Sequence, residues 1–211
     1  MPISIVKAAV SGERTNKQMH RRAALALLAT PLLGQQKNLR VILRIETELG
    51  DIIVALSGDR APRTVENFLR YVDTGQYDGG VFHRSVKPDS QMQSPVKIEV
   101  IQGGPNRASK QRLPPVPLER TSLTGLKHVD GAISMARDSA DTATADFFIC
   151  LGPQPELDFG GSRNPDGQGF AAFGLVIKGL DIVRRIQQSP VTVQTLTPPI
   201  TIKQISRVNH P

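Results

Sequence analysis

Short β-type segments recur along most of this 211-residue chain, and their recurrence limits its possible folds more than any other feature. Each segment is rich in Val, Ile, Leu or Phe, and stretches with Gly, Pro, Asp and Ser separate them. We expect strands at residues 39–46, 51–56, 81–84, 98–102, 132–136, 147–151, 172–176 and 200–208. Short antiparallel strands in this number close into a barrel or pack as a sandwich.

Two further segments have the periodicity of amphipathic helices. In the first, which starts at Ala61-Pro62, apolar residues fall at positions i, i+3, i+4 and i+7 and so share one face. These residues are Val65, Phe68, Leu69 and Val72. Pro62 suits a first helical turn, and Gly75 stands where the helix should end. The second helix, 180–188, would turn Ile182, Val183 and Ile186 inward. Two such helices could cap the open ends of a barrel.

Most of the net positive charge lies in the first 38 residues. The sequence has 26 Lys and Arg against 19 Asp and Glu, for a formal charge of +7, but six of the basic residues and one acidic residue lie in 1–38. The remaining body is nearly neutral. A broad nucleic-acid-binding surface is therefore not expected.

The same N-terminal segment has the order of a secretory signal. Met19, His20, Arg21 and Arg22 precede the apolar run AALALLATPLLG, which is too short for a transmembrane helix. We expect residues 1–38 to be a leader cleaved near Gln35, and residues 39–211 to form one domain in the periplasm or outside the cell. The alternative is a cytoplasmic protein with an amphipathic or disordered N-terminal tail.

The chain lacks the motifs of several common enzyme classes. Its four histidines, at positions 20, 83, 128 and 210, show neither HxH nor HExxH spacing. A Ser-based triad would lack a GxSxG elbow, with only His83 and His128 available as its base. Cys150 lies in the apolar run FFICL and is expected to be a buried apolar side chain. We expect neither a metal nor a cofactor.

What remains is a group of polar and apolar side chains on neighbouring predicted strands, suited to a groove that donates hydrogen bonds to a partly apolar ligand. They are Arg84, Gln102, Met135, Ala136, Arg137, Asp146, Phe148 and Leu157. The motifs around them occur in the order RTVENFLRYV, VFHR, IQGG, GAISMAR, DFFICL, ELD and FAAFGLVIKGLDIV. In order and spacing, over about residues 40–208, the chain resembles the cyclophilins, which are peptidyl-prolyl cis-trans isomerases.

The resemblance implies a mainly β fold, a closed eight-stranded antiparallel barrel with an α-helix over each end. It also implies an isomerase that rotates X–Pro bonds of proline-containing polypeptides and so assists protein folding. Arg84 would act on the amide, while Gln102 would orient Arg84 and bind the substrate backbone. The implied substrate-binding residues are Phe148, Leu157, Ala136, Val100, Glu99, Arg137, Asp146 and Phe170.

Several of these positions depart from the family pattern. The usual pocket pair Phe-Met becomes Glu99-Val100, which predicts a smaller and more polar proline pocket. Arg137 stands where Asn is usual, and Asp146 replaces a Gln. We expect Asp146 to pair with Arg84 or with Arg137, since all of them would line one groove.

Three other departures bear on binding. Phe170 takes the position of a His, and Glu156 takes that of a Trp found in many eukaryotic members, so cyclosporin binding should be weak or absent. Residues 87–97 lengthen the usual link between Arg84 and Gln102.

Two functions are compatible with the sequence. The first is a peptidyl-prolyl isomerase that assists the folding of exported proteins. The altered pocket keeps open a second, a non-catalytic proline-peptide-binding module or chaperone. In either case we expect a monomer that binds proline-containing polypeptides, without nucleic acid and without a membrane span in the mature protein.

Overall fold

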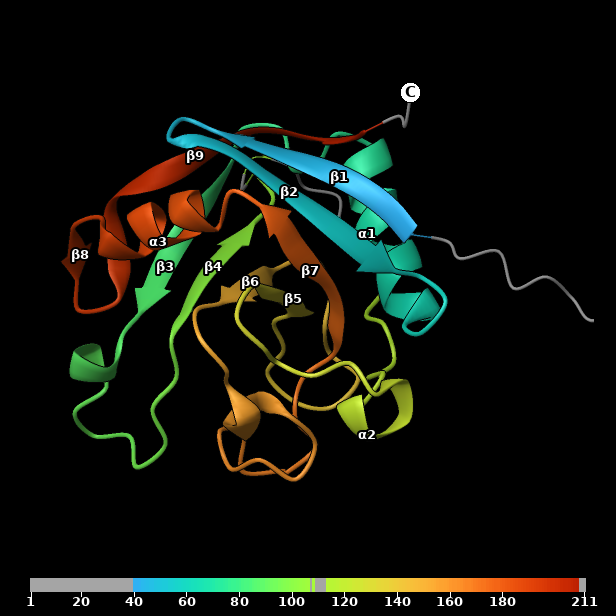
Figure 1. Ribbon diagram of the computed structural model, residues 1–211, viewed down its shortest axis with the longest axis vertical. Coiled ribbons are helices and arrows are strands. Elements are labelled where there is room, and N and C mark those ends of the chain that lie inside the picture. The colour runs from blue at the N-terminus through green and yellow to red at the C-terminus, as the bar shows by residue number, and fades with distance from the viewer. Residues whose placement is uncertain (1–39, 107, 109–112, 209–211) are drawn as a thin grey trace, which may run out of the picture. The chain divides into compact units, whose positions relative to one another are not determined.

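A computed structural model describes residues 40–106, 108 and 113–208 (Figure 1). The expected leader, residues 1–38, and the expected cleavage near Gln35 lie outside the described residues. Within the described ranges, no helix is both long enough and apolar enough to cross a membrane.

Eight antiparallel strands form a closed barrel, which confirms the fold implied by the resemblance. They are β1 (Arg40–Thr47), β2 (Gly50–Ser57), β3 (Gly80–Val86), β4 (Val100–Gly104), β5 (Ala132–Met135), β6 (Phe147–Cys150), β7 (Ala172–Lys178) and β9 (Thr195–Arg207). Their order around the barrel is β1-β2-β7-β5-β6-β4-β3-β9, and pairing of β1 with β9 closes the ring. β1 and β2 form the expected hairpin, with Gly50 at a φ of 132° that favours glycine.

Both predicted helices are present and pack on the barrel core. α1 (Pro62–Asp73) buries Val65, Phe68 and Val72, and α3 (Leu180–Gln188) buries Ile182, Val183 and Ile186. Figure 1 shows α1 and α3 at opposite ends of the barrel. The sequence did not predict four short elements, which are η1 (Pro88–Ser90), α2 (Thr121–Thr124), η2 (Pro155–Leu157) and β8 (Val191–Thr192).

Strand alternation divides the apolar side chains between the barrel interior and one outer face. Phe82 and Ile101 are fully buried in the interior cluster, while Val86 and Val100 belong to a second cluster outside it. Phe82 and Arg84 would share a face in a regular strand. A register shift between these two residues, in the pairing of β3 with β4 and with β9, moves Arg84 to the outer face. This bulge creates the site.

Candidate functional site

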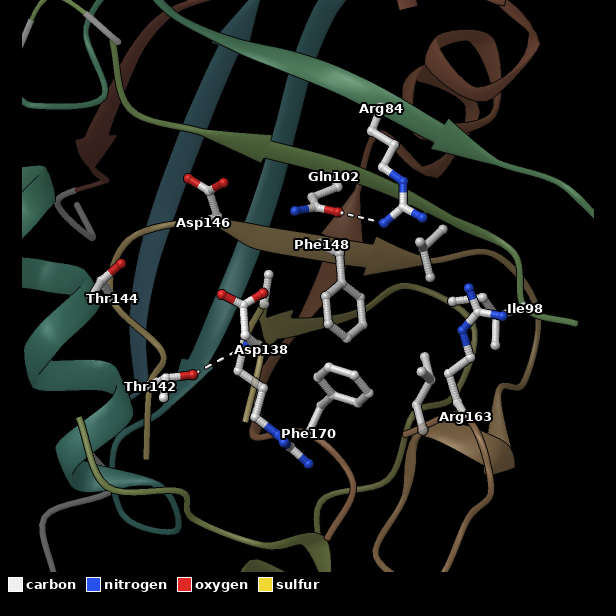
Figure 2. A pocket seen from close by; sticks show the side chains of 14 residues that line it. Arg84, Ile98, Gln102, Asp138, Thr142, Thr144, Asp146, Phe148, Arg163 and Phe170 are labelled. Atoms are coloured by element: carbon white, nitrogen blue, oxygen red, sulfur yellow. Dashed lines mark hydrogen bonds between the residues drawn. The ribbon is translucent and has the colours of Figure 1, made fainter. Parts of the chain in front are cut away.

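Three neighbouring strands place the predicted site residues in one row. Arg84 on β3 lies opposite Gln102 on β4, and Gln102 lies opposite Phe148 on β6. All three side chains extend toward a common space, as Figure 2 shows. A cation, an amide and an aromatic ring are thus fixed side by side by backbone pairing alone.

The row borders a cavity of about 390 Å³. Nine of the ten predicted site residues line this cavity, which we call the proline groove: Arg84, Val100, Gln102, Ala136, Arg137, Asp146, Phe148, Leu157 and Phe170. Its other lining residues are Ile98, Asp138, Thr142, Thr144 and Arg163. The predicted groove therefore exists as a physical cavity.

The predicted role of Glu99 was wrong. Its carboxylate accepts a hydrogen bond of 3.0 Å from Nε2 of Gln187 on α3, and it does not line the groove. Side chains alternate along an extended chain, so Val100 and Ile98 share the groove face while Glu99 points away from it. Ile98 thus supplies apolar surface that the replacement of the usual Phe by Glu99 was expected to remove.

The floor of the groove is consequently apolar, while polar and charged side chains form much of its wall. Ile98, Val100, Phe148 and Leu157 are each at most 7% exposed and belong to one cluster. Phe170 packs edge-on against Phe148, with ring centroids 5.5 Å apart. This surface suits a small apolar ring.

Neutral amides hold Arg84 in place. Its Nη1 donates to Oε1 of Gln102 at 3.1 Å, and its Nε and Nη2 donate to Oε1 of Gln194 at 3.0 and 2.6 Å. Among the described residues no carboxylate forms an ion pair with it. Burial lowers the pKa of Arg84, and the positive charge of Arg163 lowers it further. The guanidinium is therefore fixed while its charge stays uncompensated.

Arg137 is held in the opposite way. Its Nη1 and Nη2 donate to the two carboxylate oxygens of Asp166 at 2.8 and 2.9 Å, and its side chain is only 1% exposed. Its guanidinium also lies over the Phe170 ring, 5.0 Å from the centroid. The hydrogen bonds from Arg137 keep the pKa of Asp166 below its usual range.

The expected pairing of Asp146 with an arginine was wrong. Arg137 pairs with Asp166, and the hydrogen bonds of Arg84 go to glutamines. Asp146 lies over Gly104 instead, where a Cβ atom would collide with its carboxylate. Glycine at position 104 therefore allows the close approach of the Asp146 carboxylate, and its φ is not in the left-handed region.

A buried hydrogen-bonded chain supports the groove from behind Phe148. His128 Nδ1 lies 2.8 Å from Asp158 Oδ1, its Nε2 lies 3.0 Å from Ser134 Oγ, and its ring stacks on Phe148 at 5.9 Å. The order Asp-His-Ser is that of a hydrolase triad. Ser134 is fully buried, however, so a substrate cannot reach its hydroxyl. The chain fixes Phe148 and does not act as a nucleophile.

Sequence reasoning missed two groups that shape the site. Gln194 follows β8 and Arg163 follows η2, and both come from loops far in sequence from Arg84. No periodicity or motif marks either residue. Ile98, in contrast, could have been found by counting two residues back from Val100. Within the part of the chain that is described, no cluster of three His, Cys, Asp or Glu side chains could hold a metal ion.

Comparisons with known proteins agree with this geometry. A family profile described as cyclophilin type peptidyl-prolyl cis-trans isomerase/CLD matches residues 42–207. The peptidyl-prolyl cis-trans isomerase cyp18 of Streptomyces antibioticus is 36% identical over 147 residues, which are 68% of this chain and 81% of that protein. Peptidyl-prolyl cis-trans isomerase A of Dickeya dadantii is 37% identical over 68% of this chain and 70% of its own length.

Solved structures show the same fold. A cyclophilin-type peptidyl-prolyl cis-trans isomerase of Cryptosporidium parvum superposes with a TM-score of 0.65 at 23% identity, over 82% of this chain and 99% of its own. A second structure of that protein, determined in the presence of the dipeptide Ala-Pro, gives a TM-score of 0.63 at 23% identity, over 80% and 99% of the two chains.

Proposed function

The chain belongs to the cyclophilin-type peptidyl-prolyl cis-trans isomerase family, and on that premise we propose that it rotates X–Pro bonds with Arg84 as the acting group. The observation that carries this proposal is the row of Arg84, Gln102 and Phe148. It puts a fixed, uncompensated guanidinium beside an apolar pocket.

The task of such an enzyme is to lower a rotational barrier. Resonance gives the peptide C–N bond a barrier of about 18–20 kcal/mol. The upper value corresponds to roughly 0.01 rotations per second. Because the cis and trans forms of X–Pro bonds lie within about 1 kcal/mol of each other, both are populated and only the barrier limits exchange.

Twisting the bond breaks conjugation and localises the lone pair on the proline nitrogen. A hydrogen-bond donor near that nitrogen stabilises the twisted state more than either planar state, and this difference is catalysis. Arg84 uses three of its five N–H bonds on Gln102 and Gln194, which leaves two for the substrate. No nucleophile, acid or base is required.

The apolar floor holds the substrate in register with that donor. Ile98, Phe148 and Leu157 would contact the proline ring and place its nitrogen below Arg84. Because backbone pairing and the bond to Gln194 fix Arg84 before substrate arrives, little ordering remains for the reaction step.

We also propose that the protein assists the folding of exported proteins. The basic, then apolar, order of residues 19–34 supports this proposal. N-terminal sequencing of the protein from its own cells should find a start near Gln35. A periplasmic or secreted form that retains Met1, or a purely cytoplasmic one, would overturn it. Weak cyclosporin binding stays a prediction from Glu156.

Exchange spectroscopy by NMR on a proline tetrapeptide tests the activity directly. Wild-type protein at catalytic concentration should raise the cis–trans exchange rate far above the spontaneous rate. A protein that binds the peptide and shifts its resonances without accelerating exchange would be the binding module instead.

A further inference from the structure

A second groove adjoins the proline groove. It has a volume of about 920 Å³, and its walls come from the insertion 87–97, the hairpin of β8 with β9, and Arg163. We call it the accessory groove. In Figure 1 the loop that follows β3 and the β8 hairpin lie on the same side of the barrel.

The insertion is held as a defined wall. Gln91, only 4% exposed, donates through Nε2 to the carbonyl oxygens of Lys87 and Ile98 at 2.8 and 2.7 Å. The Oε1 of Gln91 accepts a hydrogen bond from Nη1 of Arg163 at 2.9 Å. Nη1 of Arg163 also donates to Ser94 Oγ and to the Val96 carbonyl at 3.0 and 2.7 Å. These bonds tie the insertion to Ile98, which lines the proline groove.

The two grooves share walls. Arg163 lines both of them. Gln194 lines the accessory groove and accepts from Arg84, while its own Nε2 donates to the carbonyl oxygen of Ser90 at 3.0 Å. In Figure 2, Arg163 and Arg84 lie at the end of the proline groove that is farther from Asp146 and Thr144. The accessory groove is thus continuous with the catalytic end.

Two apolar side chains stand exposed along the accessory groove. Met92 is 90% exposed and Val193 is 77% exposed. Val193 has a φ of 61°, a left-handed conformation that β-branched residues seldom adopt. Such strain persists where the surrounding structure imposes it, and it concentrates at functional sites. At Val193 the left-handed backbone exposes an apolar side chain to solvent, and this exposure does not stabilise the isolated protein.

Arg163 adds hydrogen-bonding capacity at the junction. All of its side-chain hydrogen bonds within the described chain use Nη1 and go to neutral oxygens. Its Nε and Nη2 find no acceptor among these residues, so they are available to carbonyl groups of a ligand that passes from one groove to the other.

We propose that the accessory groove binds the segment of the substrate polypeptide that flanks the proline, in extended form, with an apolar side chain against Met92 and Val193 and a backbone carbonyl on Arg163. This inference rests on the proposed isomerase function. It assigns the insertion a role in selecting longer polypeptides over short proline peptides.

The test measures how peptide length affects Kd and turnover in proteins with an intact or an altered accessory groove. The peptides are Ala-Ala-Pro-Ala and two versions of it, each extended by a leucine-containing segment on one side of the proline. The proteins are wild type, Met92→Ser/Val193→Asn, and Leu123→Ser, a control that removes an exposed apolar side chain on α2, outside both grooves. NMR exchange gives the turnover, and titration gives the Kd in the same samples.

In wild type and in the control, we expect at least one extension to bind about fivefold or more tightly than the short peptide. The double variant should lose this advantage but turn over the short peptide at the wild-type rate. Equal Kd values for all peptides in wild type, or an advantage that survives in the double variant, would overturn the inference. Absent turnover of the short peptide would instead defeat the isomerase proposal, and the Kd ratios would still decide the role of the groove.

Discussion

Arg84 and Arg137 both line the proline groove, but their guanidinium groups have different partners. Arg137 forms a bidentate ion pair with Asp166 and covers the Phe170 ring, so its positive charge is balanced within the protein. Arg84 is held only by the amide oxygens of two glutamines. A carboxylate partner fixes an arginine and neutralises it, whereas an amide partner fixes it and leaves its charge for a ligand.

The largest effect should come from removing each arginine in turn. Arg84→Ala should lower kcat/KM about 100-fold, the typical cost of deleting one preorganised donor at a transition state. Arg137→Ala, the matched control in the same groove, should act mainly on KM. NMR exchange rates at several peptide concentrations separate the two parameters. Equal losses of kcat in both variants would erase the proposed distinction.

Releasing Arg137 from its carboxylate should have a smaller effect. Asp166→Asn keeps the shape of the side chain but removes the charge that holds the guanidinium beside Phe170. We expect KM for a proline tetrapeptide to rise roughly threefold with kcat unchanged, because only the wall of the groove is loosened. A fall in kcat larger than the rise in KM would place Arg137 in the reaction itself.

The pH dependence should separate activity from stability. The partners of Arg84 are amides that do not titrate, and arginine stays protonated, so kcat should be flat between about pH 5 and pH 8. Asp158 behaves differently: burial raises its pKa, but the hydrogen bonds and charge of His128, with help from Lys127, outweigh this and lower it overall. The pKa of Asp166 is also lowered.

Both carboxyl groups therefore stabilise the fold above their unfolded pKa of about 3.9, and this contribution is lost as pH falls through the lower folded values. Thermal melts should show a plateau in Tm that declines below about pH 4. A bell-shaped kcat profile centred near neutrality would require an acid or base that the account does not contain.

The smallest effect should come from Asp146→Gln. Asp146 lines the groove but pairs with neither arginine. Turnover of a proline tetrapeptide should therefore change less than about twofold. A tenfold change in kcat would mean that the carboxylate modulates the field of Arg84 from its place above Gly104.

Regular elements of this fold were predictable because each has a strong local signal. α3 spans the predicted residues 180–188, and α1 begins at the predicted Pro62. β9 begins at Thr195, not at the predicted residue 200. The prediction missed this start because the strand runs through Pro198 and Pro199, and proline is disfavoured within strands. The bulge that turns Arg84 outward leaves no sequence signal and depends on pairing with two other strands.

The site was predictable to a similar degree. Residues on paired strands, such as Gln102 and Phe148, were placed by motif order. Glu99 was misassigned because strand alternation, rather than position in a motif, decides which side chains face the groove. Gln194 and Arg163 come from loops whose approach to Arg84 is fixed only by the closed barrel.

The central claim is that Arg84 must be held without being neutralised, and Gln194→Glu tests it most directly. The change keeps an acceptor oxygen for Nε and Nη2 but gives Arg84 the kind of partner that Arg137 has. Gln194→Leu is the uncharged comparison, because it removes both the bond to Ser90 and the acceptor for Arg84 without adding a carboxylate. The account predicts that kcat in Gln194→Glu falls about tenfold, at least as far as in Gln194→Leu. Wild-type kcat in Gln194→Glu would contradict it.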